Sequence, residues 1–282
     1  MVSREKDGTL KSPDGLKIYY RYFRTEDERA RIVITHGLGE HSGRYGNVVD
    51  RLLPEGLSVW AMDLRGHGKS EGRRGHIQAF DDYMSDLGAM VHHVRKEIPE
   101  GMKCLLLGHS MGGLVALDFA LKFPDLIDGV IISSPSLGIS VKVPLFKRVL
   151  GSLMSSVLPS LTLKNGLDTD KLSHDPAVAP AYVNDPLVHD KVSARWFTEI
   201  LLTMEKLMGS AAGMDVPILL QLAGDDHLTD VSASRQFFEK MVLKDRTLHV
   251  YEGRYHEIYN EREDLRSQPM EDLAAWIEKR LS

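Results

Sequence analysis

The sequence has one cysteine, no long apolar run and no excess of positive charge. Because Cys104 is alone, no disulfide can form within the chain, and its apolar neighbours 105–107 predict a buried, inert thiol. No run of 18 apolar residues occurs, and the charged start of the chain lacks the apolar core of a secretory signal. We therefore expect a soluble, cytoplasmic protein.

Charge balance and missing motifs exclude further function classes. Lys and Arg number 35 against 40 Asp and Glu, which gives a formal net charge of -5. Without a basic surface to attract phosphates, we expect no nucleic-acid partner and instead a small molecule. The phosphate-binding pattern G-x-x-x-x-G-K-[ST] and the metal-binding pattern H-E-x-x-H are both missing. The oligomeric state is not readable from the sequence.

Short apolar strands alternate with helices along most of the chain. A hairpin of 9–13 and 17–23 is expected across Asp14-Gly15. Further strands are expected at 31–35, 57–62, 103–107, 217–222 and 247–251, and helices at 80–98, 114–123, 231–242 and 270–281. This alternation predicts an α/β fold with a mostly parallel, doubly wound sheet.

One segment, 135–215, interrupts the alternation with helical patterns and prolines but no convincing strand. We expect residues 1–134 and 216–282 to form the core domain and 135–215 to form an inserted helical cap. Between Val141 and Leu163, apolar residues recur at helical spacing on one face, which would suit the wall of an acyl tunnel. Two other interpretations of this face are transient contact with a membrane surface and packing on the core. Packing on the core is the favoured interpretation.

The pattern G-x-S-x-G occurs at 108–112, between a predicted buried strand and a predicted helix. Its glycines permit a strained turn that exposes the hydroxyl of Ser110, and the following helix directs its N-terminal amides at the reacting carbonyl. Ser110 is thus the candidate nucleophile, and the N–H of Met111 is a candidate oxyanion donor. A turn with no catalytic role is the alternative, and the strand-to-helix context disfavours it.

Partners for the serine follow from chain order. In α/β hydrolases the acid and then the histidine come after the serine, each on a loop that follows a strand. Among the histidines beyond the cap, His256 alone follows a strand and a glycine loop, so it is the candidate general base. The acid should follow strand 217–222, where Asp225 and Asp226 fit equally by spacing. Leu38, after the first buried strand, is the natural second oxyanion donor.

These groups suffice for ester hydrolysis without a cofactor or a metal ion. A serine hydroxyl becomes a useful nucleophile when a histidine takes its proton, and a carboxylate orients that histidine. Two backbone amides hold the tetrahedral oxyanion. Collapse releases the alcohol, and water then cleaves the acyl-enzyme.

Four segments have a more specific pattern. They are 36–45 (H-G-L-G-E-H-S-G-R-Y), 66–72 (G-H-G-K-S-E-G), 108–113 (G-H-S-M-G-G) and 251–256 (Y-E-G-R-Y-H). With them, nearly the whole chain resembles the monoacylglycerol lipase and lysophospholipase family of serine α/β hydrolases. The resemblance implies the α/β-hydrolase fold and a lipid-ester substrate.

The resemblance also implies roles for single residues. The acid of the family aligns with Asp226, because its pattern ends D-x-x-x-D, as 226–230 do here. Leu38 would supply an oxyanion amide, and Glu40 and Arg44 would lie near the bound glycerol. An ordinary surface ion pair is an equally weighted alternative for these two.

One position departs from the family pattern. Some members have a second histidine three residues after the catalytic one, where this chain has Tyr259. A phenol can still hydrogen-bond a glycerol hydroxyl, so Tyr259 is the third candidate substrate-binding residue.

The expected function is hydrolysis of monoacylglycerols to glycerol and free fatty acid. A lysophospholipase or a broad carboxylesterase would use the same residues and is the alternative. A non-catalytic lipid-binding module is a third hypothesis, which the complete set of Ser110, Asp226 and His256 disfavours. Head group, acyl-chain length, regiospecificity and pathway are not determined by the sequence.

Overall fold

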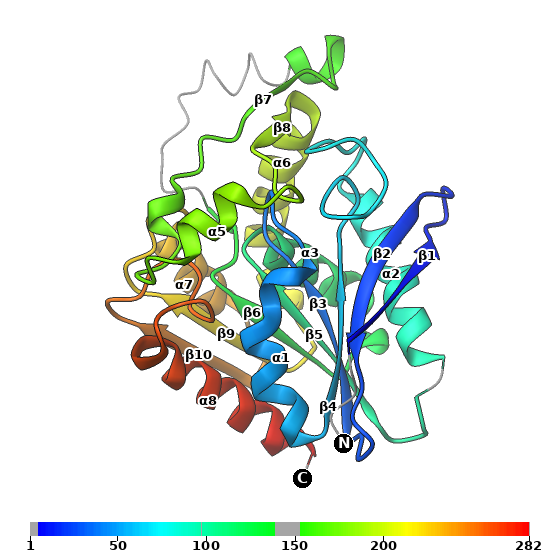
Figure 1. The fold of residues 1–282 in the computed structure, drawn as a ribbon, viewed down its shortest axis with the longest axis vertical. Coiled ribbons are helices and arrows are strands. Elements are labelled where there is room, and N and C mark those ends of the chain that lie inside the picture. The colour runs from blue at the N-terminus through cyan, green and yellow to red at the C-terminus, as the bar shows by residue number, and fades with distance from the viewer. Residues whose placement is uncertain (1–4, 97, 139–152, 282) are drawn as a thin grey trace.

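A computed structural model describes all residues except 1–4, 97, 139–152 and 282. An eight-stranded sheet lies at its centre, with strand order β1-β2-β4-β3-β5-β6-β9-β10 (Figure 1). The pairs from β4 to β10 are parallel, whereas β1 and β2 run antiparallel at one edge. The strands are β1 (Lys6–Lys11), β2 (Lys17–Phe23), β3 (Ala30–Thr35), β4 (Leu57–Met62), β5 (Lys103–His109), β6 (Gly129–Ser133), β9 (Ile218–Ala223) and β10 (Arg246–Tyr251). The predicted mostly parallel sheet is confirmed.

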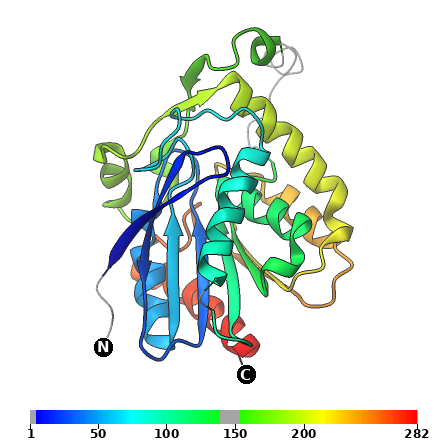
Figure 2. The same ribbon diagram turned by 90° about the vertical axis from the view of Figure 1, so that its right-hand side faces the viewer.

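Helices cover both faces of this sheet (Figures 1 and 2). One face packs against α1 and α8, and the other against α2, α3, α6 and α7. The helices are α1 (Gly46–Leu52), α2 (Asp81–Arg95), α3 (Met111–Lys122), α5 (Val178–Asn184), α6 (Ala194–Ser210), α7 (Val231–Lys240) and α8 (Glu263–Leu281).

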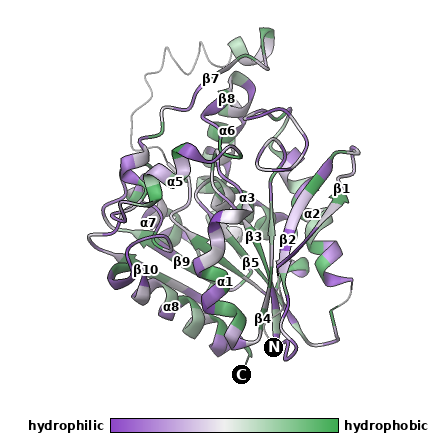
Figure 3. Ribbon diagram, in the orientation of Figure 1, coloured by the Kyte–Doolittle hydropathy of each residue, from purple (hydrophilic) through white to green (hydrophobic). Residues whose placement is uncertain are grey.

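Alternation along the central strands explains the two covered faces. In β5, Leu105 and Leu107 pack in the cluster beneath α1 and α8, while Leu106 packs in the cluster on the opposite face. Successive side chains of a strand point to opposite faces, so a continuous apolar run supplies both layers. In Figure 3 hydrophobic colour accordingly runs along the central strands.

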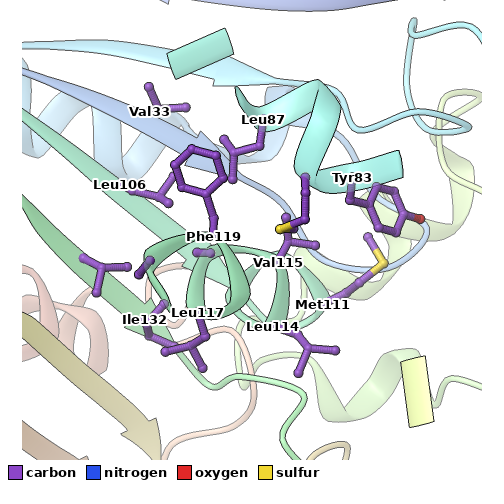
Figure 4. Packing of buried hydrophobic residues seen from close by; sticks show 14 of the residues in the cluster. Val33, Tyr83, Leu87, Leu106, Met111, Leu114, Val115, Leu117, Phe119 and Ile132 are labelled. Atoms are coloured by element: carbon purple, nitrogen blue, oxygen red, sulfur yellow. The ribbon is translucent and has the colours of Figure 1, made fainter. Parts of the chain in front are cut away.

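Helix α3 lies in the larger of these two clusters. Figure 4 shows its residue Phe119 between the sheet residue Leu106 and Leu87 of α2, with Val115 next along the helix and Leu114 on the opposite side of α3. All five side chains are fully buried. Since α3 starts directly after Ser110, this packing anchors the turn that carries the serine.

The described part of the segment between β6 and β9 adds no strand to the central sheet and lies above it in Figure 1. It contains α5, α6 and a two-stranded antiparallel sheet of β7 (Thr162–Lys164) and β8 (Lys191–Ser193). The sequence shows no convincing strand in 135–215, and these two were missed because three residues are too few to show an alternating pattern. The exact division at 135 and 215 stays a prediction.

Most of the apolar helix expected at 141–163 falls outside the described residues. Residues 153–157 are helical. Leu153, Val157 and Leu158 are 59%, 65% and 51% exposed, so in this part of the chain the favoured interpretation, packing on the core, is wrong.

Candidate active site

Ser110 lies on a strained turn between β5 and α3. Its φ of 54° and ψ of −117° are outside the regions that non-glycine residues usually adopt. A Cβ on Gly112 would be 2.3 Å from the carbonyl oxygen of Thr35, and one on Gly108 would be 2.4 Å from that of Gly112. Glycine is thus required at both positions for the strand and the helix to approach so closely. The hydroxyl of Ser110 is 3.3 Å from that of Ser136.

A histidine and a carboxylate lie at the same carboxyl edge of the sheet. Nδ1 of His256 is 2.7 Å from Oδ2 of Asp226, and the two side chains are 4% and 1% exposed. The His256 ring is 4.8 Å, centroid to centroid, from that of His109, the residue before the serine. Asp225, the competing acid by spacing, is exposed. The structure thus brings Asp226, not Asp225, to His256.

Hydrogen bonds and charge keep Asp226 ionised. Burial raises the pKa of its carboxyl, but the charge and hydrogen bond of His256 outweigh burial, and the N–H groups of Thr229 and Leu228 add to that effect, so the pKa falls to about 2. Those amides donate to Oδ1 at 2.9 and 2.8 Å. Conversely, burial lowers the pKa of His256, but Asp226 outweighs it and the pKa is raised. A carboxylate at Nδ1 holds the proton there, which leaves Nε2 as the base.

The loop after β3 lies against the serine. A Cβ on Gly37 would be 3.3 Å from Cβ of Ser110, so Leu38, the next residue, is close to the nucleophile. Within the described residues the N–H of Leu38 has no hydrogen-bond partner. Met111 is the first residue of α3, and an N–H at that position has no partner within its helix. Both candidate oxyanion donors are therefore next to the nucleophile.

Glu40 is buried beside this loop, and Arg44 is largely enclosed with it. Glu40 is 3% exposed and accepts hydrogen bonds from the Gly37 N–H at 2.6 Å and from Arg44 at 2.7 Å. Arg44 also donates to both oxygens of Glu257, at 2.5 and 2.8 Å. Burial raises the pKa of Glu40, but Arg44 and His109 outweigh it and lower the pKa to about 2. The surface-ion-pair alternative is wrong, because the pair is internal.

A small cavity lies beside these groups. It is lined by Glu40, Arg44, His109 and Glu257 among others and measures about 10 Å³, which is room for one water molecule at most. This cavity is too small for glycerol, and the role of Glu40 and Arg44 in binding glycerol stays a prediction.

Tyr259 also lines this small cavity. Its side chain is 4% exposed and packs in the cluster beneath α1 and α8. Its hydroxyl donates to the side-chain oxygen of Gln221. Because that hydroxyl already has a buried partner, its position does not favour the predicted contact with glycerol.

Sequence reasoning missed Glu257 and Tyr182, a residue of α5 in the segment expected to form the cap. Glu257 is next to the candidate base and Tyr182 stacks under the guanidinium of Arg44, 4.8 Å from it. Neither position belongs to a local motif, since the partners are separated by more than a hundred residues. The one sequence signal for Glu257 is its place directly after His256.

A serine on such a turn and a buried histidine–carboxylate pair after later strands occur together in α/β hydrolases, and the chain is a serine hydrolase of that class. Residues 26–263 match the family described as "Serine aminopeptidase, S33". The chain belongs to this family.

Named relatives span most of the chain. A monoacylglycerol lipase of Mycolicibacterium smegmatis is 32% identical over 269 residues, which is 93% of each protein. Phospholipase YtpA of Bacillus subtilis is 37% identical over 241 residues, 84% of this chain and 92% of that protein. An uncharacterised abhydrolase domain-containing protein of Dictyostelium discoideum is 36% identical over 254 residues, 89% of this chain but only 26% of that protein.

Among solved structures, the monoacylglycerol lipase of Paleococcus ferrophilus superposes with a TM-score of 0.83 at 34% identity, over 98% of this chain and 99% of that chain. The predicted α/β-hydrolase fold, the family resemblance and the class of serine ester hydrolase are confirmed. Within the described residues, no helix is long and apolar enough to cross a membrane.

Proposed function

We propose that this protein hydrolyses monoacylglycerols to glycerol and free fatty acid through an acyl-enzyme on Ser110. The observation that carries the proposal is the buried pair of His256 and Asp226 at 2.7 Å, with the His256 ring 4.8 Å from that of His109, which precedes a serine at φ 54°. Two proteins named monoacylglycerol lipase, at 32% and 34% identity over almost the full chain, support the substrate class.

In the first half of the reaction, Nε2 of His256 takes the proton of the Ser110 hydroxyl as Oγ attacks the ester carbonyl. Asp226 stabilises the imidazolium that forms. The N–H groups of Leu38 and Met111 stabilise the developing oxyanion, and removal of one such donor costs on the order of 10²–10³ in kcat. The imidazolium then protonates the departing glycerol oxygen, and the carbonyl reforms as an ester of the serine.

In the second half, His256 takes a proton from water, and the hydroxide formed adds to the acyl carbonyl. The same two amides hold the second oxyanion. Its collapse breaks the bond to Oγ of Ser110, which recovers its proton from His256. Fatty acid leaves, and the resting enzyme is restored.

Charge next to the serine supports a neutral head group. Arg44 is held by two carboxylates, Glu40 and Glu257, so the formal charge of this buried trio is −1. Like charges repel strongly where little water screens them, so a phosphate head group with a net negative charge would be disfavoured nearby. Glycerol carries no charge and avoids this cost.

A lysophospholipase is the second candidate, and the 37% identity to a protein named phospholipase favours it. The test measures fatty-acid release from monoacylglycerols and from lysophosphatidylcholine of equal chain length, with Ser110→Ala as the control. We expect kcat/KM to be higher for monoacylglycerol by at least about tenfold, and both activities to disappear in Ser110→Ala. Equal or faster turnover of lysophosphatidylcholine would reject the glycerol substrate and keep the mechanism.

A further inference from the structure

Three contacts join the cap to the loop that carries Leu38. The hydroxyl of Tyr182, on α5, donates to the carbonyl oxygen of Leu38 at 3.1 Å. The backbone N–H of His189 donates to the carbonyl oxygen of Gly39 at 2.9 Å. Nε2 of His41 is 2.9 Å from a carboxylate oxygen of Asp185, at the end of α5. The cap therefore contacts the loop at consecutive peptide groups.

The fit between cap and loop is close at Gly39. A Cβ at this position would lie 2.4 Å from the backbone oxygen of His189 and 2.9 Å from the hydroxyl of Tyr182. Its φ of 79° also belongs to the left-handed region that favours glycine. The loop can thus meet the cap at hydrogen-bonding distance only with glycine here.

The core holds the same loop from the other side. The N–H of Leu64 donates to Nε2 of His36 at 2.9 Å, so the ring proton must be on Nδ1, which donates to the carbonyl oxygen of Gly37 at 2.7 Å. Burial lowers the pKa of His36, which keeps the ring neutral and preserves this arrangement. The loop is held by the core at Gly37 and by the cap at Leu38 and Gly39.

Leu38 lies between these two sets of contacts. Peptide groups are planar, so fixing the oxygen of Gly37 fixes the direction of the Leu38 N–H in the same plane. Fixing the oxygen of Leu38 fixes the next plane, and together the two set both dihedral angles of this residue. We propose that Tyr182 and the backbone of His189 are positioning elements for the oxyanion amide of Leu38, so that the docked cap completes the oxyanion hole. The inference rests on the proposed role of Leu38.

A preorganised donor is stronger than one that must reorient during the reaction, because reorganisation consumes part of the stabilisation. The loss of one positioning hydrogen bond should weaken the oxyanion hole and leave binding of the uncharged ester intact. Acylation and deacylation both pass through an oxyanion, so the two steps should slow together and KM should hardly change. This pattern separates positioning from a general loss of structure.

The test is Tyr182→Phe, which removes the hydroxyl and keeps the ring beneath Arg44. Its matched control is Tyr83→Phe, which removes the hydroxyl that accepts the Trp196 indole N–H at 3.1 Å. That bond also joins the cap helix α6 to the core, but it does not touch the loop. Both variants lose one tyrosine hydroxyl at the boundary between cap and core.

We would measure kcat and KM with a short p-nitrophenyl ester, the inhibition constant of a trifluoromethyl ketone that forms an oxyanion with the serine, and the melting temperature. For Tyr182→Phe we expect kcat to fall about tenfold, the inhibitor to bind weaker by the same factor, and KM to stay within about twofold. For Tyr83→Phe we expect kcat within about twofold of wild type at a comparable melting temperature.

Unchanged kcat in Tyr182→Phe, or equal losses in both variants, would overturn the inference. The synthetic ester keeps this test independent of the natural substrate. Ser110→Ala, run alongside, must abolish turnover; if it does not, the proposed nucleophile fails rather than the role of the cap.

Discussion

Replacement of Asp226 by asparagine removes the charge that faces His256 and changes little else in shape. The carboxyl pKa of about 2, against an ordinary value near 3.9, corresponds to roughly 2 to 3 kcal/mol in favour of the ionised form. The charge and hydrogen bond of His256 are the largest of the causes that lower this pKa, and the same interaction stabilises the imidazolium in the transition state, so loss of the carboxylate charge alone is worth on the order of 10²-fold in rate. An amide can also present its N–H₂ to Nδ1, which favours the wrong tautomer of the ring. We therefore expect kcat to fall by roughly 10⁴-fold in Asp226→Asn.

The matched control is Asp225→Asn, since the adjacent carboxylate is exposed and equally acceptable by sequence spacing. Initial rates with a p-nitrophenyl ester, together with melting temperatures of both variants, provide the assay. Asp225→Asn should keep kcat within about twofold. The reasoning is refuted if Asp226→Asn retains more than about a tenth of the activity while folded, or if the two variants lose activity equally.

Three more outcomes follow. His256 must be neutral to accept a proton, and its pKa is raised. The acid limb of a kcat/KM pH profile should therefore lie above pH 6.5, the ordinary pKa of a histidine. An acid limb below pH 6.5 would contradict the pairing with Asp226. Gly112→Ala places a Cβ against backbone and should cost about 1–3 kcal/mol in urea unfolding, whereas Gly88→Ala, with 3.8 Å of clearance, should not destabilise. Burial raises the pKa of Cys104 to about 12, so iodoacetamide should label it only after unfolding, and rapid labelling of native protein would refute its burial.

Agreement between sequence and structure is best where a local signal marks an element. β4 has the predicted bounds, 57–62, and the opening hairpin pairs 6–11 with 17–23. The connection is five residues, 12–16, rather than the two expected at Asp14-Gly15, because β1 ends at Lys11. Helix α8 begins at Glu263 and continues through Pro269, whereas apolar spacing is visible only after that proline.

One central strand, β6, is missing from the predicted set. Its five residues, Gly129–Ser133, are all buried, and a short apolar run without alternation cannot be told from a piece of buried helix. Its place in the sheet depends on pairing with β5 and β9, which are more than 20 and more than 80 residues distant in the chain. Only the assembled sheet identifies it.

At the candidate site, the motif 108–112 and the loop order predict which residues converge. The family resemblance already favours Asp226 over Asp225, and the structure pairs Asp226 with His256. The structure adds contacts between elements: the internal position of Glu40 and the hydroxyl of Tyr182 on the loop of Leu38. These depend on the packing of distant segments, for which the sequence has no periodic signal.

Covalent trapping tests the assignment of Ser110 most directly. The purified protein would be treated with a fluorophosphonate probe and digested, and the modified peptide would be sequenced by mass spectrometry. The account predicts one modified residue, Ser110, complete loss of ester hydrolysis in parallel with labelling, and no labelling of Ser110→Ala. Modification at another residue, or hydrolysis that persists in the fully labelled protein, would contradict it.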